Sequence, residues 1–276
     1  MRRGFSAGLL ILVFGVLLFM GANTNRHYQA RQSSQISVAV PIPLQVLESM
    51  GDRFFAANLA VWRVLMTGGE SMPKESLDAL ARVQEDASFL NPAHEDNYVM
   101  ATSLLPWEGY IEPTQLILRR ATESRKKDHF APFFYGFNQI HFLKDGKGAF
   151  EYGQIAASHA QDEGDRQALM VISAAWLERG NDPALAEKII SLMAGELKDP
   201  QLRQHLEKRA ERQKVVLKLQ AAADDYLIRV GRPLERIDQL VVMGILESIP
   251  GDPVGTVEFI VDSSGRVGFK QRTPKR

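Results

Sequence analysis

The side chains that could support catalysis or metal binding are few and dispersed in this 276-residue chain. Five of the six histidines stand singly along the body of the chain, with no spacing that places two of them on one helix face as a metal pair. They are His94, His129, His141, His159 and His205. Cysteine is absent, which removes disulfides, thiolate zinc sites and cysteine nucleophiles. We therefore expect no metal site and no cofactor.

Carboxylates gather at two places, Asp162, Glu163 and Asp165 in a turn and Asp224-Asp225 on a helix. Such groups ordinarily cap helices or face water, although paired carboxylates can also do acid–base work. The chain contains none of the glycine-rich phosphate loops, nucleophile elbows or H-E-x-x-H motifs that mark common enzyme sites. We expect no catalytic residues and a protein that is not an enzyme; a hydrolase built on an all-helical fold is the less favoured alternative.

Aromatic residues are concentrated in one predicted helix hairpin, over residues 130–152. Most of these rings should be core, because ring burial holds helix pairs together. If the protein has a surface for a partner, this hairpin and the aromatic residues just before it are the first candidates. The predicted partner-binding residues are Trp107, Tyr110, Phe134, Tyr135, Phe137 and Tyr152.

Helical periodicity dominates from Leu44 to about Val230 and strand-like alternation is absent there. Asn91-Pro92, Gly180 and Pro200 are among the residues that mark helix ends and starts. The connections are short, which is typical of antiparallel helix hairpins. The predicted helices are 44–66, 73–90, 93–105, 113–127, 132–144, 147–160, 165–179, 183–197 and 200–230.

A 34-residue spacing relates Ala87, Ala121 and Ile155, and the same spacing relates Pro92, Lys126 and Ala160. Over residues 73–197 the chain resembles the tetratricopeptide repeat in a degenerate form, since no unit carries the full set of small and large positions. The resemblance implies a stacked array, assigned to 44–199, with a concave surface that binds protein segments. A generic helical bundle is the alternative.

The N-terminal segment has no charged residue between Arg3 and Arg26, and Phe5–Ala22 is apolar apart from Ser6. At about 1.5 Å per residue, this length matches a hydrocarbon core of about 30 Å. We expect a transmembrane anchor over 1–25 and a linker over 26–43; a cleaved signal peptide is the alternative.

Residues 200–276 are expected to form a long helix and a small α+β cap with a β-hairpin around Asp262-Ser263-Ser264-Gly265. Pro250, Asp252, Pro253 and Gly255 form a Pro-x-Asp-Pro-x-Gly element that resembles the C-terminal region of type II secretion pseudopilins. The acidic loop that can hold calcium in that family has no counterpart here, so calcium binding is not implied. The charged first half of the long helix is expected to face water.

Lysine and arginine number 33, and so do aspartate and glutamate, which argues against binding nucleic acid. The body over 48–262 has a net charge of −9 between two basic ends. The sequence thus predicts a mainly α protein in the bacterial inner membrane with its body in the periplasm. Its expected role is a scaffold or assembly factor that binds another protein of an envelope complex; a pseudopilin-like subunit of a pilus or secretion apparatus is the alternative.

Overall fold

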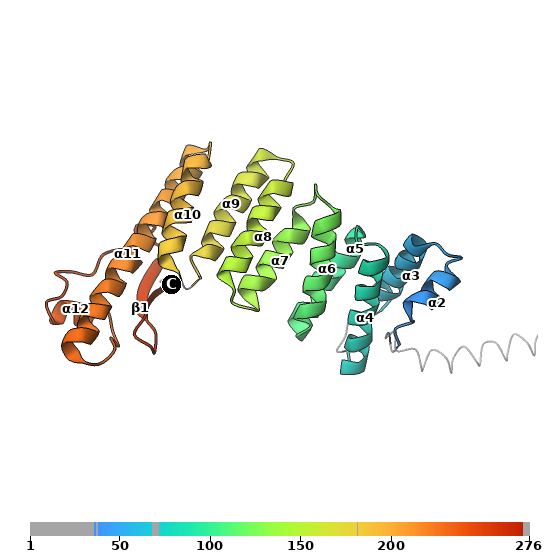
Figure 1. Ribbon diagram of the computed structural model, residues 1–276, viewed down its shortest axis with the longest axis horizontal. Coiled ribbons are helices and arrows are strands. Elements are labelled where there is room, and N and C mark those ends of the chain that lie inside the picture. The colour runs from blue at the N-terminus through green and yellow to red at the C-terminus, as the bar shows by residue number, and fades with distance from the viewer. Residues whose placement is uncertain (1–35, 37, 68–71, 181, 273–276) are drawn as a thin grey trace, which may run out of the picture. The chain divides into compact units, whose positions relative to one another are not determined.

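The computed structural model describes residue 36 and residues 38–67, 72–180 and 182–272. These residues form eleven α-helices, one 3-10 helix and a two-stranded antiparallel sheet near the C-terminal end (Figure 1). The expectation of a mainly α fold with a small sheet is therefore confirmed. The expected membrane anchor, Phe5–Ala22, lies outside the described residues.

The chain divides into two compact units, residues 1–105 and 106–276. The helices of the first unit are α2 (Ile42–Glu48), α3 (Arg53–Leu65), α4 (Lys74–Leu90) and α5 (Glu95–Leu104). Alanines let α3 approach its neighbours closely, because Ala56 and Ala57 are buried together with Leu90 of α4. The helix expected at 73–90 is confirmed as α4.

The expectation of a single helix over 44–66 is wrong, because this segment forms two helices, α2 and α3, joined by a short non-helical connection. Met50 and Gly51 adopt positive φ angles of 53° and 89°, a conformation that cannot continue a right-handed helix. Asp52 then starts α3, and its side chain accepts hydrogen bonds from the backbone N–H groups of Phe54 and Phe55 at 2.8 and 3.1 Å.

The second unit begins with the rest of a short 3-10 helix, η1 (Leu105–Glu108), and continues through helices that pack on their neighbours in sequence. Glycines permit the closest approaches: a Cβ added to Gly136 of α7 would lie 2.7 Å from the Trp176 ring of α9. The helices are α6 (Ile111–Ser124), α7 (Phe130–His141), α8 (Gly146–His159), α9 (Glu163–Leu177), α10 (Pro183–Glu196) and α11 (Pro200–Val230).

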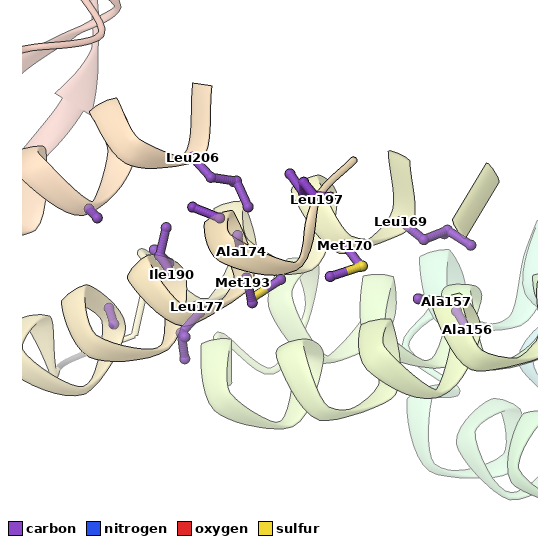
Figure 2. Close-up of a cluster of buried hydrophobic side chains, with 13 residues drawn as sticks. Ala156, Ala157, Leu169, Met170, Ala174, Leu177, Ile190, Met193, Leu197 and Leu206 are labelled. Atoms are coloured by element: carbon purple, nitrogen blue, oxygen red, sulfur yellow. The ribbon is translucent and has the colours of Figure 1, made fainter. Parts of the chain in front are cut away.

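A large cluster of buried side chains in the second unit lies where α9, α10 and α11 pack together. Figure 2 shows Leu177, Ile190, Met193 and Leu206 meeting there, all of them buried. Removal of this much aliphatic surface from water is the main stabilising contribution at this place. Because α11 contributes Leu206 and Ala210 to the cluster, the first half of the long helix is held in the core along one face.

The C-terminal module packs on the second half of α11, which ends at Gly231 with φ 75°. It consists of α12 (Asp238–Val242) and the antiparallel strands β1 (Val257–Val261) and β2 (Val267–Gln271), joined by the expected turn. Phe259 stands opposite Phe269 in the register. Among the described helices, none is both long and apolar enough to cross a bilayer.

Candidate protein-binding surface

One face of α7 carries a row of aromatic side chains. Phe130, Phe134, Phe137 and His141 are spaced at i, i+4, i+7 and i+11, which places them on one side of the helix. Phe130 is 52% exposed and His141 is exposed, whereas Phe134 and Phe137 are half-buried. The Phe130 and Phe134 rings stack with centroids 6.4 Å apart, and those of Phe137 and His141 with centroids 5.2 Å apart.

Trp107 of η1 extends this line at the His141 end. The Trp107 ring lies 5.2 Å from the His141 ring and meets Phe142 edge-on at 5.1 Å. Trp107 is 57% exposed, so most of its indole faces solvent although both neighbours hold its orientation. We call Trp107, Phe130, Phe134, Phe137 and His141 the aromatic stripe.

Contacts with α8 and α9 hold α7 in place, and Phe137 of the stripe takes part in them. Ile140 is buried with Ala149 of α8 and Trp176 of α9, and Phe133 and Phe137 pack against them. Phe133 also contacts Phe134 edge-on, with centroids 5.7 Å apart. A helix seated this firmly presents its exposed rings as rigid contact area, which is how aromatic residues favour binding at low entropic cost.

The other predicted site residues do not belong to the stripe. Tyr135 and Tyr152 stack on each other with centroids 3.6 Å apart and an interplanar angle of 15°. Burial of Tyr152, together with the charge and hydrogen bond of Tyr135, raises the pKa of the Tyr152 phenol to about 12. Tyr110 precedes α6, and its carbonyl accepts a 2.8 Å hydrogen bond from the Thr114 hydroxyl. Of the predicted site residues, Trp107, Phe134 and Phe137 thus belong to the stripe, and Tyr135 and Tyr152 form a pair of their own.

His141 is the member of the stripe that inspection of the sequence does not single out. As a lone histidine it has no metal-ligand spacing, yet it stands four residues after Phe137 and eleven after Phe130. That helical spacing is the signal that assigns it to the aromatic face. Its role in the stripe is ring contact, which suits aromatic or aliphatic side chains or a cation held over the rings.

The expectation that the charged residues in the first half of α11 face water is wrong for Arg209 and Arg212. Arg212 is buried, and its Nε donates to Asp252 Oδ1 at 2.9 Å while its Nη2 donates to the Thr256 hydroxyl at 3.0 Å. Both arginines also pair with the buried carboxylate of Glu178 at the end of α9. Glu207, Lys208, Glu211 and Lys214 do face solvent.

Asp252, the acid of the Pro-x-Asp-Pro-x-Gly element, organises its own turn. Its side chain accepts hydrogen bonds from the backbone N–H groups of Val254, Thr256 and Val257 at 3.1, 2.7 and 2.9 Å. Burial alone would raise the pKa of Asp252, but these hydrogen bonds and those from Arg212 hold the pKa below its usual value. The group is fully engaged within the fold, so its role is structural.

The carboxylates that could have done acid–base work are also occupied in folding contacts. Asp162 caps α9 by accepting from the N–H groups of Gly164 and Asp165, and Asp225 pairs with Arg229 at 2.6 Å. Within the described residues no three histidine or carboxylate side chains lie close enough to hold a metal ion. The chain matches no protein-family model, no curated protein and no solved structure at a significant level.

Proposed function

We propose that this protein is a non-enzymatic scaffold or assembly factor that binds another protein through the aromatic stripe. The observation that carries the proposal is the row of exposed and half-buried rings along one face of α7, extended at the His141 end by Trp107 of η1. Aromatic residues are enriched at the centres of protein–protein interfaces, where they supply large contact areas. The partner would present apolar or aromatic side chains, or a cationic one, to these rings.

The proposal includes a divergent tetratricopeptide-like array as the scaffold. Two features support it: Ala87 and Ala121, related by 34 residues, are both fully buried, and the glycines of α7 and α8 sit where helices approach most closely. Ile155, the third residue at that spacing, is half-buried. Small residues at such positions are what allow helix pairs to stack in repeat proteins.

The proposed location is the bacterial inner membrane, with Phe5–Ala22 as the anchor and the body in the periplasm. The support is the sequence of the apolar run and the basic residues before it. A pseudopilin-like subunit is the second candidate, favoured by the turn that Asp252 builds in the Pro-x-Asp-Pro-x-Gly element. In that case the apolar helix would pack into a filament.

Site-specific photocrosslinking in native membranes tests the first candidate. A photoreactive phenylalanine at position 130 or 107 should form a crosslink to one partner, whereas the same residue at the exposed positions Leu192 or Ile228 should not. The variant Trp107→Ala/His141→Ala should reduce the crosslink from position 130 without changing the far-UV circular dichroism. Equal crosslinking from all four positions would refute a specific surface, and crosslinks between copies through the apolar helix would favour the filament subunit.

A further inference from the structure

The first unit exposes a concentration of large apolar side chains. Of the 23 large apolar side chains that are exposed among the described residues, ten fall between residues 38 and 66. Met50 is 99% exposed, and Trp62 is 62% exposed. The ten are Val38, Leu44, Leu47, Met50, Phe54, Phe55, Leu59, Trp62, Leu65 and Met66. Clusters of exposed apolar side chains mark interaction surfaces on proteins or membranes.

Helix α3 is apolar on two opposite faces. One face carries alanines and valines that are buried within the first unit: Ala56, Ala57, Ala60, Val61 and Val64. The other carries Phe55, Leu59, Trp62 and Met66 at helical spacing, all exposed. We call these four residues, together with Leu47 and Met50 before them, the α2–α3 apolar face. Because α3 needs only its alanine face to pack within the unit, the aromatic face is available to something else.

The sequence around this face indicates what covers it. The uncharged run that begins after Arg3 ends before Arg26, and Ile36 is the first residue that the structure describes. Eleven residue steps span at most about 35–40 Å, so an anchor ending there would keep the face close to the membrane surface. A tether this short gives an effective concentration in the millimolar range, so even weak affinity for the membrane is enough.

The face itself carries no charged residue. The charges next to it in the sequence are mixed, with Arg53 and Arg63 on α3 and the exposed acids Glu48 and Asp52 before the helix. The Arg53 guanidinium lies 4.6 Å from the centre of the Phe54 ring, and Arg63 donates a 3.0 Å hydrogen bond to the Val38 carbonyl. Tryptophan, phenylalanine and leucine on one face with arginine at its edge is the composition of helices that lie in the membrane interface.

We infer that the α2–α3 apolar face lies in a phospholipid bilayer, at the boundary between headgroups and acyl chains. The inference rests on the anchor of the proposed function and adds a second contact, which holds the first unit flat against the membrane. The binding surface on α7 is a separate feature and is not involved.

Tryptophan fluorescence of the full-length protein in lipid vesicles tests the inference. The variants Trp107→Phe and Trp62→Phe each keep the buried Trp176 and differ in which exposed tryptophan remains. In vesicles of phosphatidylglycerol and phosphatidylcholine brominated near the top of the acyl chains, Trp62 should lose about half of its emission. Trp107, at 57% exposed against 62% for Trp62, is the matched control and should be unaffected.

A charged residue introduced into the α2–α3 apolar face should release the face from the bilayer. Leu59→Glu in the Trp107→Phe background should abolish the quenching of Trp62, whereas Leu192→Glu, at an exposed leucine of α10, should leave it unchanged. Flotation separates the two proposals. A chain that floats with the vesicles but keeps an unquenched Trp62 overturns the inference and leaves the anchor. A chain that does not float overturns both, and an unquenched Trp62 that crosslinks to another protein assigns the face to a protein partner instead.

Discussion

Arg212 shows how much a single charged residue can organise when it is buried. Its guanidinium is enclosed between Asp252, Thr256 and Glu178, and the Phe269 ring lies 5.3 Å from its centre. These contacts join α11, the end of α9 and the C-terminal module. A buried ion pair adds little net stability compared with apolar residues, but removing one partner leaves the other charge buried and uncompensated.

The first prediction follows from that asymmetry. Asp252→Ala removes the acceptor of Arg212 and of three backbone N–H groups, so the free energy of unfolding should fall by about 3–5 kcal/mol. Asp238→Ala is the control, since the Asp238–Arg236 pair is exposed and its loss should cost less than about 1 kcal/mol. Urea denaturation followed by circular dichroism measures both. Equal effects of the two substitutions would contradict the structural role of Asp252.

The second prediction concerns the titration of Tyr152. Its pKa of about 12 in the folded protein lies above the ordinary value of 10, so the folded state holds the phenolic proton more tightly than the unfolded state. The stability from this group is therefore complete below pH 10 and is lost as the pH rises toward 12. Absorbance titration of wild type and Tyr152→Phe should differ by one phenol titrating near pH 12. A difference centred at pH 10 would refute the buried environment.

At the scale of the elements, Gly51 and Gly195 both have open space around them but differ in backbone conformation. Gly51 has φ 89° and lies in the connection between α2 and α3, whereas Gly195 lies in α10 and has no positive φ. An added methyl group would contact nothing within 4 Å at either position. The difference between the two glycines is therefore a difference of backbone conformation alone.

The third prediction uses this pair. Gly51→Ala should destabilise the first unit by about 1–2 kcal/mol, because a side chain disfavours the left-handed conformation. Gly195→Ala should stabilise the second unit by up to about 1 kcal/mol, because alanine favours the helix. Hydrogen exchange followed by mass spectrometry should show faster exchange in α3 for the first variant and slower exchange in α10 for the second. The same sign of change for both would contradict the assignment.

At the scale of the whole molecule, the division into two compact units makes the effects of distant substitutions separable. Gly51 belongs to the first unit and Asp252 to the second, and among the described residues the two share no hydrogen-bond partner. The double variant Gly51→Ala/Asp252→Ala should therefore show additive changes within about 0.5 kcal/mol. Hydrogen exchange in α3 and α11 of the two single variants and the double variant measures each unit by itself. A marked excess in the double variant would show energetic coupling between the units.

The sequence predicts most helices because their ends carry local signals, such as Asn91 after α4 and Gly231 after α11. The break at Gly51 was missed because a lone glycine inside an apolar periodic run reads as a tolerated helix residue. In the candidate site, the aromatic concentration around Phe134 and Phe137 is visible from composition. The burial of Arg212 cannot be predicted from the sequence, because its partner Asp252 lies 40 residues away and no local pattern around Arg212 indicates the pairing.

The link between Arg212 and Asp252 also has a consequence for the order in which the second unit folds. Helix hairpins such as α7 and α8 close over short separations in the chain, and contacts of that kind form early. The contact of Arg212 with Asp252 and that of Gln220 with the Val267 N–H span 40 and 47 residues. During synthesis, α11 is therefore complete before Asp252 is made, and Arg212 then has only one of its two carboxylate partners, Glu178. The second carboxylate, Asp252, is supplied only when the C-terminal module is complete. A chain truncated before residue 252 therefore retains an incompletely paired Arg212, which favours removal of that chain by cellular quality control.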